Sequence, residues 1–142
     1  MRSEQPGALA AETPRVLKRN TNQRKAIRDV FSEADRPLST EEVLKAAQRH
    51  KPGLGIATVY RTIKALLDES WLCVVKLPSE PPRYERAGKP HHHHFYCQAC
   101  GRVYEVPGSV ALLDTLVPKG FTLESHGLVL CGRCAECTAK SG

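Results

Sequence analysis

Residues 56–70 read IATVYRTIKALLDES, and their spacing decides the fold of the N-terminal half. Apolar side chains recur at helical intervals, which predicts a helix with one buried stripe. That stripe comprises Ile56, Val59, Ile63, Leu66 and Leu67. The opposite face carries a tyrosine and two cations and comprises Ala57, Tyr60, Arg61 and Lys64. A half-buried helix with such a face is typical of one that docks into a DNA major groove, where arginine reads guanine.

Two further helices are expected before this one. The inner face of the first, at residues 21–34, comprises Ile27, Val30, Phe31 and Ala34. Thr21 or Asn22 is its expected N-cap. Ser39 and Glu42 have the S-x-x-E spacing of a capping box, which predicts the start of a second helix. The inner face of the second helix comprises Val43, Leu44 and Ala47. Residues 51–55, KPGLG, then break the chain.

A hairpin is expected after the three helices. Residues 71–77, WLCVVKL, are apolar and β-branched; residues 78–82, PSEPP, favour a turn; and residues 83–87, RYERA, return as a second strand. Two helices joined by a short glycine-containing turn and followed by a hairpin fit a winged helix-turn-helix. The alternative is a helical domain with a solvated basic face and no nucleic-acid partner.

The C-terminal part holds two Cys-x-x-Cys pairs, Cys97 with Cys100 and Cys134 with Cys137. Four thiolates suit Zn²⁺, because a d¹⁰ ion accepts a tetrahedral sulfur shell. A redox dithiol of the thioredoxin type would belong to a βαβ unit, whereas the segment after Cys100, GRVYEV, resembles a strand. A pairing of Cys131 with Cys134 stays open, and so does a role for Cys131 as a small core residue of a strand.

Four consecutive histidines occupy residues 91–94, just before the first cysteine pair. The run is internal and short, which disfavours a purification tag. In a strand, His91 and His93 share one face while His92 and His94 share the other. The run therefore predicts two metal sites, one on each side of a strand.

The remaining segments predict a small α+β unit. Residues 109–120, SVALLDTLVPKG, indicate a short helix, and residues 121–130, FTLESHGLVL, indicate strands. The core of so short a unit would be thin. Zinc binding, worth on the order of 10 kcal/mol or more at structural sites, would supply part of the missing stability. Pairing with a second copy of the chain would supply more.

Composition narrows the class of protein. The 142 residues carry a formal charge of +6, most of it in residues 1–86. No apolar run of about 18 residues is present, and the N-terminus lacks an apolar segment. We therefore expect a cytoplasmic protein with no membrane partner. In that reducing compartment, six cysteines favour metal or redox chemistry over disulfides.

Enzymatic chemistry has little support in the sequence. Zinc deaminases need H-x-E with P-C-x-x-C, and zinc proteases need H-E-x-x-H; neither pattern occurs. No small-molecule substrate is indicated. A zinc buffer or metallochaperone, or a thiol redox protein, stays open as an alternative, although neither needs a helix-turn-helix.

Three stretches resemble the ferric uptake regulator (Fur) family of bacterial metalloregulators: GLGIATVYRTIKALLDE at 53–69, HHHHFYCQACGRVYEV at 91–106 and GRCAEC at 132–137. The resemblance spans about residues 14–138. It implies an α+β fold, with an N-terminal winged helix and a C-terminal dimerisation domain. It also implies a homodimer that binds palindromic operator DNA at the nucleoid and represses transcription according to metal supply.

The resemblance assigns roles residue by residue. The structural zinc ligands are Cys97, Cys100, Cys134 and Cys137. The ligands of a regulatory, interdomain site are Cys73, Glu85, His92 and His94. The ligands of a weaker peripheral site are His91, His93 and His126. Leu112 stands where the peripheral site of the family has a glutamate, and Asp114 or Glu105 would have to substitute for it. The DNA contacts are Arg19, Thr58, Tyr60 and Arg61.

Two departures from the family pattern bear on the sensed ion. Iron- and peroxide-sensing members carry a histidine where Pro37 stands, and zinc-type members often carry a cysteine near Ala87. Cys73 with Glu85 and two histidines still makes a shell of four ligands, in which a thiolate favours zinc over ferrous iron. We therefore expect Zn²⁺ in both sites, as in a zinc uptake regulator. Fe²⁺ or Mn²⁺ at the regulatory site, or a peroxide response, is the alternative.

The expected organisation has four parts. They are a flexible tail at 1–13, a winged-helix DNA-binding domain at 14–86, a hinge at 87–90 and a metal-binding dimerisation domain at 91–142. One ion held by ligands from the wing and from the dimerisation domain would cross-link the two domains. The two DNA-binding domains of a dimer would then be held at one half-site spacing.

Overall fold

The computed structural model describes residues 14–108 and 111–141, with side chains at 21–108 and 113–140. The expected tail at 1–13 and the side chains of Arg19 and Leu112 lie outside these described residues. The helices are α2 (Pro14–Ala34), α3 (Thr40–Ala47), α4 (Ile56–Asp68), the 3₁₀ helix η1 (Ala111–Leu116) and α5 (Ala135–Ser141). The strands are β1 (Leu72–Leu77), β2 (Glu80–Arg86), β3 (His92–Cys97), β4 (Val103–Pro107) and β5 (Val129–Gly132). In the part of the chain that the structure describes, no helix is long and apolar enough to cross a bilayer.

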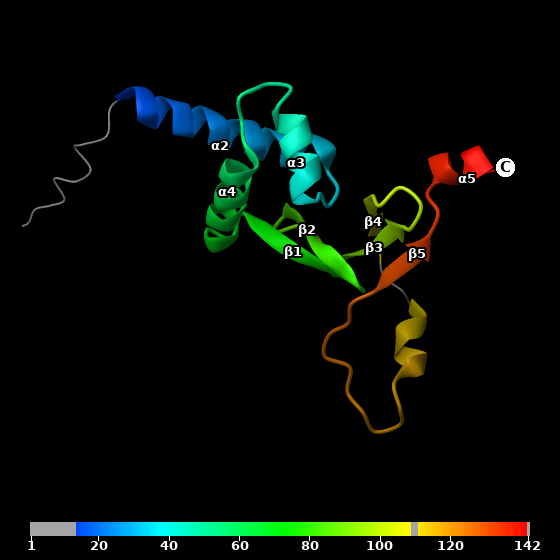
Figure 1. Ribbon diagram of the computed structural model, residues 1–142. Helices are drawn as coiled ribbons and strands as arrows, with labels where there is room; N and C mark the ends of the chain where they lie inside the picture. The colour runs from blue at the N-terminus through cyan, green and yellow to red at the C-terminus, as the bar shows by residue number, and fades with distance from the viewer. Residues whose placement is uncertain (1–13, 109–110, 142) are drawn as a thin grey trace, which may run out of the picture.

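Helices α2, α3 and α4 enclose one apolar core beside the β1–β2 hairpin (Figure 1). The large side chains that are fully buried in this core include Phe31, Ile27, Leu66, Val43 and Val59. The predicted capping box is confirmed at α3. The Ser39 hydroxyl accepts a hydrogen bond from the Glu42 backbone N–H, and the Glu42 carboxylate accepts one from the Ser39 N–H. These two bonds satisfy otherwise orphaned donors and define where α3 begins.

Two details of the helices differ from expectation. Helix α2 begins at Pro14 and not at Thr21 or Asn22, because proline suits the first turn of a helix and no breaker follows it. Ile56 is 39% exposed and does not join the buried stripe. It is the first residue of α4, whose inner face is buried only from Val59 onward.

The antiparallel strands β1 and β2 form the wing hairpin, and its two faces differ. Leu72 and Tyr84 lie on the face that packs against the helical core. Side chains alternate along each strand, so the residues between them point the other way. On that second face, Cys73 pairs with Glu85 and Val75 pairs with Arg83.

The wing turn is tighter than the PSEPP segment suggested. Leu77 pairs with Glu80, which leaves only Pro78 and Ser79 in the turn, and Ser79 adopts a positive φ of 58°. The prolines that follow, at positions 81 and 82, lie in strand β2. A two-stranded sheet has only edge strands, where the missing N–H of proline is tolerated.

The second sheet has the strand order β4-β3-β5, with β4 antiparallel and β5 parallel to β3. Of the segment expected to form strands at 121–130, only the end is a strand, since β5 starts at Val129. Phe121 and Leu123 precede it as exposed, irregular chain. The helix expected at 109–120 is a short 3₁₀ helix, which ends before Pro118 and Gly120.

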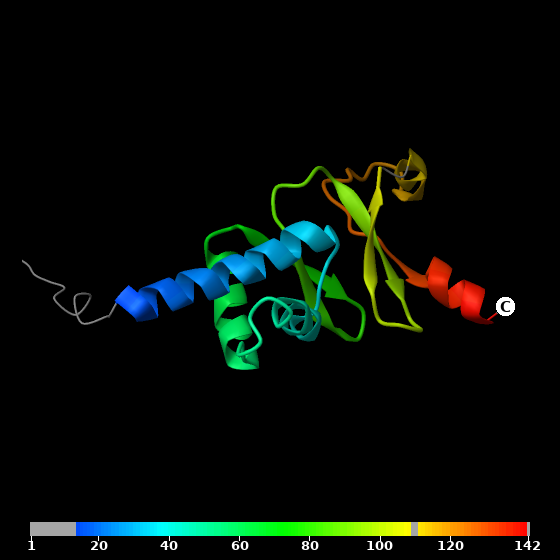
Figure 2. The same ribbon diagram turned by 90° about the horizontal axis from the view of Figure 1, so that it is seen from above.

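The wing lies between the helices and the second sheet, as both views show (Figures 1 and 2). Val75 and Leu77 of β1 are buried together with Val103 of β4, and Tyr96 and Val129 pack against them. The second face of the wing is therefore covered by the C-terminal sheet. This contact brings side chains of β2 next to side chains of β3.

A matched pair of isoleucines tests the helical core. Ile27→Ala removes a side chain with no exposed surface and is expected to cost about 2–5 kcal/mol of unfolding free energy. Ile56→Ala removes the same atoms from a 39% exposed position and should cost no more than about 1 kcal/mol. Urea unfolding of the metal-loaded protein, followed by circular dichroism, measures both values. Equal costs would contradict the assigned core.

Candidate metal centres and nucleic-acid face

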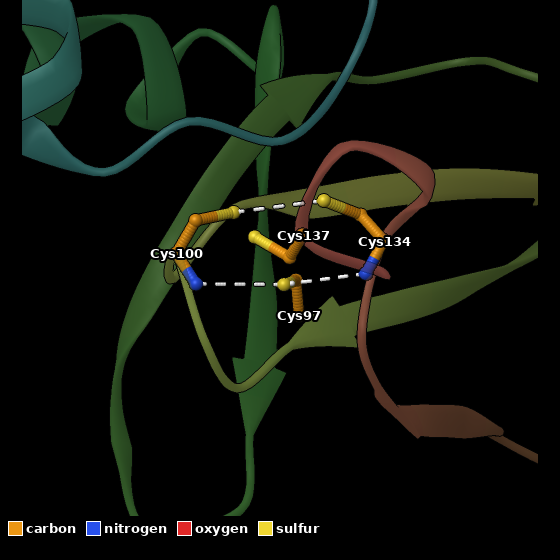
Figure 3. A group of neighbouring side chains, drawn as sticks. All are labelled: Cys97, Cys100, Cys134 and Cys137. Carbon is orange, nitrogen blue, oxygen red and sulfur yellow. Dashed lines mark hydrogen bonds between the residues drawn. The ribbon is translucent and has the colours of Figure 1, made fainter. Parts of the chain in front are cut away.

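Four cysteines from two Cys-x-x-Cys turns lie together (Figure 3). The first turn, or first knuckle, holds Cys97 and Cys100, and the second knuckle holds Cys134 and Cys137. Their sulfurs all lie within 4.8 Å of one another. Cys97 is the last residue of β3, and Cys100 lies in the turn after it, where Gly101 takes a φ of +81° that lets the chain turn back into β4. The second pair spans the start of α5. Four sulfurs that face one point suit a tetrahedral Zn²⁺.

Hydrogen bonds prepare these sulfurs to carry negative charge. The backbone N–H groups of Cys100 and Cys134 donate to the Cys97 sulfur, at 3.4 and 3.3 Å, and lower the pKa of Cys97 to about 6. The hydrogen bond with the Cys134 sulfur raises the pKa of Cys137 to about 12. Without a cation, the neighbouring sulfurs cannot all ionise together. A divalent ion removes this conflict, so the donor set fits zinc.

Cys131 stands outside this cluster. It is exposed on β5 and is not one of the four grouped sulfurs. A zinc site that uses Cys131 with Cys134, in place of Cys134 with Cys137, is therefore not the one that the structure forms. The alternative role of Cys131 as a core residue is also wrong, because its side chain faces solvent.

A second cluster joins the wing to the C-terminal sheet. His92 and His94, on one face of β3, place their Nε2 atoms 2.9 and 3.1 Å from Glu85 Oε2 of β2. The two Nε2 atoms are 3.1 Å apart. Glu85 is 4% exposed, and its other oxygen, Oε1, is buried with no hydrogen-bond partner. A buried, half-satisfied carboxylate facing two imidazoles is suited to a cation, so these residues fit a metal ion.

The charge of the Glu85 carboxylate also favours a cation in this cluster. Burial opposes the charged forms, yet the hydrogen bonds from His94 and His92 lower the pKa of Glu85 overall. For His92, burial lowers the pKa, but the hydrogen bonds to the Pro90 carbonyl and to Glu85 outweigh it, so the pKa of His92 is raised overall. The ring N–H at Nδ1 of His92 donates to the Pro90 carbonyl at 2.8 Å, which leaves Nε2 as the nitrogen for a metal.

Cys73 lies beside this second cluster. It pairs with Glu85 across the wing and is partly buried, but its sulfur is not among the ligand atoms within 4.8 Å of one another. Burial raises the pKa of the Cys73 thiol, and the charge of Glu85 raises it further. The thiol therefore needs a cation nearby to ionise.

Glu105 and Lys89 border the same cluster, and sequence reasoning missed both contacts. Glu105 pairs with His94 across β3 and β4, and its Oε1 lies 3.6 Å from His92 Nε2. Glu105 thus faces the wing. It cannot replace the glutamate that the peripheral site lacks at Leu112, because that site lies on the opposite face of β3. Lys89 Nζ donates to Glu105 at 2.6 Å and to Asp35 at 3.2 Å, and so links the end of α2 to β4.

The third cluster comprises His91, His93 and His126 on the other face of the histidine run. His91 Nε2 and His126 Nε2 are 3.1 Å apart. His93 is 3% exposed, and its Nε2 is buried without a hydrogen-bond partner. Burial lowers the pKa of His93 and so favours the neutral, metal-binding form. Asp114 is exposed and is not a member of this group.

The expected DNA-binding face of α4 is open. Ala57, Tyr60, Arg61 and Lys64 are all exposed, with Tyr60 at 53%. Arg61 Nη2 donates to the Thr58 hydroxyl at 3.2 Å, which orients the guanidinium along the helix surface.

Comparison with known proteins decides the family. The family model "Ferric uptake regulator family" matches residues 17–131, most of the chain. The chain belongs to the ferric uptake regulator family. The ferric uptake regulation protein of Campylobacter jejuni is 32% identical over 122 residues, which cover 82% of this chain and 78% of that protein.

Solved Fur-family structures share the mixed helix-and-sheet fold. The ferric uptake regulator Fur of Helicobacter pylori superposes with a TM-score of 0.61, at 27% identity over 83% of both chains. A zinc-bound manganese uptake regulator superposes with a TM-score of 0.73, at 27% identity over 79% of this chain and 87% of its own. This Fur-family chain is thus a metal-dependent transcriptional regulator, of a family of regulators and not of enzymes.

Proposed function

We propose that this chain is a zinc-responsive repressor that binds palindromic operator DNA as a homodimer in the cytoplasm. The observation that carries the proposal is the contact of Glu85 in the wing with His92 and His94 in the C-terminal sheet. These ligands come from the two proposed domains, the winged helix at 14–86 and the dimerisation domain at 91–142. The segment 87–90 between them is the proposed hinge.

The proposed mechanism follows from this placement. Without metal, the wing and the sheet are held by hydrogen bonds that water can replace and by a small apolar contact. Glu85, His92 and His94 would hold an ion through one carboxylate and two imidazole nitrogens. Metal binding then stabilises the arrangement of the two domains that fits two successive major grooves.

The proposed zinc preference rests on Cys73. A sulfur ligand added to one carboxylate and two imidazoles makes four ligands of the kind zinc accepts. Glu105, 3.6 Å from His92, offers a further oxygen in place of the thiol. An oxygen-rich set would suit Fe²⁺ or Mn²⁺. Relatives of this chain are named for ferric and for manganese uptake regulation.

The remaining clusters complete the proposal. The four cysteines would hold structural Zn²⁺. The three-histidine cluster would be a peripheral metal site, in line with a relative, the Helicobacter pylori Fur, whose structure reveals three functional metal binding sites. The proposed DNA contacts are Thr58, Tyr60 and Arg61 on α4, with Arg19 in the minor groove.

The zinc preference is tested by Cys73→Ser. We expect a loss of roughly tenfold or more in zinc affinity of the regulatory site, with Mn²⁺ affinity nearly unchanged, because the hydroxyl is a poor ligand for zinc. Competition with chelators of known affinity measures both constants. Cys131→Ser is the matched control, since it alters a thiol outside the three ligand clusters found among the described residues. Unchanged zinc affinity in Cys73→Ser would contradict the zinc assignment and favour the oxygen-rich set.

The DNA-binding face is tested by Arg61→Ala. We expect a loss of about 1–3 kcal/mol of binding free energy for a selected palindromic duplex, as for an arginine that contacts a base. Lys25→Ala is the control, because Lys25 lies on α2 and is paired with Asp29. Fluorescence anisotropy measures both affinities with metal in excess. Equal losses in the two variants would show that α4 does not read the DNA.

A further inference from the structure

Arg83 is a buried cation without an anionic partner. Its side chain lies on the wing face that the second sheet covers, and the residue is 7% exposed. Nη1 donates to the Pro81 carbonyl at 2.8 Å and Nη2 to the Gly101 carbonyl at 3.0 Å, while Nε is buried without a partner. No carboxylate of the described residues forms an ion pair with it. A buried charge that meets only neutral acceptors is costly, so a compensating charge is expected.

The cysteine cluster offers such a charge. Gly101, whose carbonyl accepts from Arg83, directly follows the ligand Cys100 in the first knuckle. Four thiolates around one divalent ion leave two negative charges in excess. The guanidinium of Arg83 ends at the carbonyl of the residue next to the ligand Cys100, 3.0 Å from it, so it lies beside the turn that carries this excess charge. Because Arg83 itself is buried, its attraction to a nearby negative charge is screened less than that of an exposed cation.

The register of the wing gives this contact a second consequence. Arg83 and Glu85 lie two residues apart on the same face of β2. Glu85 reaches the histidines of β3, and Arg83 reaches the knuckle at the end of the same strand. One face of one wing strand therefore contacts both the proposed regulatory site and the structural site.

We propose that Arg83 is a buried counter-cation of the structural zinc–thiolate centre, besides the surface Arg102 that Cys100 already attracts, and that it holds the wing on the first zinc knuckle. Arg83 is a positioning residue: it touches neither metal site directly. It offsets the negative charge of the thiolates, slows release of the metal, and fixes the wing strand that presents Glu85. This role does not depend on which ion the regulatory site senses or on DNA binding.

The test measures metal release from the sulfur site of the full-length, reduced protein. Cobalt(II) is loaded in place of zinc, because its sulfur-to-metal absorption reports thiolate ligation, and its decay is followed after excess EDTA is added. Arg83→Gln removes the charge and keeps hydrogen-bonding capacity. Arg83→Lys keeps the charge. Arg86→Gln is the matched control, because it makes the same charge change at an exposed position of the same strand.

We expect Arg83→Gln to release cobalt about tenfold faster than wild type or more, the usual cost of removing a partner outside the ligand shell. Arg83→Lys and Arg86→Gln should stay close to wild type. Hydrogen exchange of β1 should also accelerate in Arg83→Gln, whereas exchange in α2 should not. If Arg83→Gln fails to fold, the cobalt release rate of Arg83→Lys tests the proposal by itself. Release as slow as in wild type would support a role for the positive charge. Wild-type release from Arg83→Gln, or fast release from Arg83→Lys, would overturn the proposal.

Discussion

Cys97→Ser is expected to abolish the fold of the C-terminal part while leaving the helical core intact. Cys97 is fully buried, and its sulfur accepts backbone hydrogen bonds from both knuckles. Its loss removes a ligand from a site whose zinc is worth on the order of 10 kcal/mol or more, while the buried core of this part is small. Zinc content per protomer and heteronuclear NMR of the purified variant measure the outcome.

Cys131→Ser is the control for this prediction. It makes the same substitution only a few residues from the second knuckle, but at an exposed position outside the cluster. Zinc content and the spectrum should match wild type. A folded, zinc-loaded Cys97→Ser, or equal damage from Cys131→Ser, would show that the structural site has been assigned to the wrong sulfurs.

His94→Ala should have the second largest effect, on the proposed regulatory site. His94 Nε2 approaches both Glu85 and His92, so its removal leaves the buried carboxylate with one imidazole. We expect zinc affinity at this site to fall by more than about 100-fold, beyond the usual cost of losing an outer-shell partner. Binding stoichiometry from isothermal titration calorimetry should show one ion fewer per protomer at micromolar zinc.

His91→Ala is the matched control for His94→Ala. It removes an imidazole from the same run, but from the opposite side of β3, where it meets His126. It should weaken only the peripheral cluster and leave the interdomain affinity unchanged. Loss of the same binding event in both variants would mean that the four histidines do not form two separate sites.

Much of the helical part could be read from the sequence, because its signals are local. The periodicity of α4 and the spacing of Ser39 and Glu42 depend only on residues within a few turns. The sequence predicts too late a start for α2, because Thr21 and Asn22 are good caps that the chain does not use. Capping preference is worth about 1 kcal/mol, which continuing the helix outweighs.

The two faces of the histidine run could also be predicted, because strand alternation is a local rule. Contacts between distant elements could not. Glu105 joins the His92 side only through the register of β3 with β4. Lys89 and Arg83 matter because they lie between parts of the chain that fold against one another. The spacing of residues along the chain does not predict the register between strands. The sequence therefore shows that Lys89 and Arg83 are charged, but not which groups they contact.

The most direct test of the account is the affinity of the protein for a palindromic duplex, measured against buffered free zinc. The duplex is selected from a randomised pool by the zinc-loaded protein, and the structural zinc is verified before each measurement. We predict that wild-type affinity rises by at least about tenfold as the regulatory site fills, whereas His94→Ala binds weakly at all zinc levels. Binding that is equally tight without regulatory zinc, or a full zinc response in His94→Ala, would contradict metal-controlled DNA binding through this site.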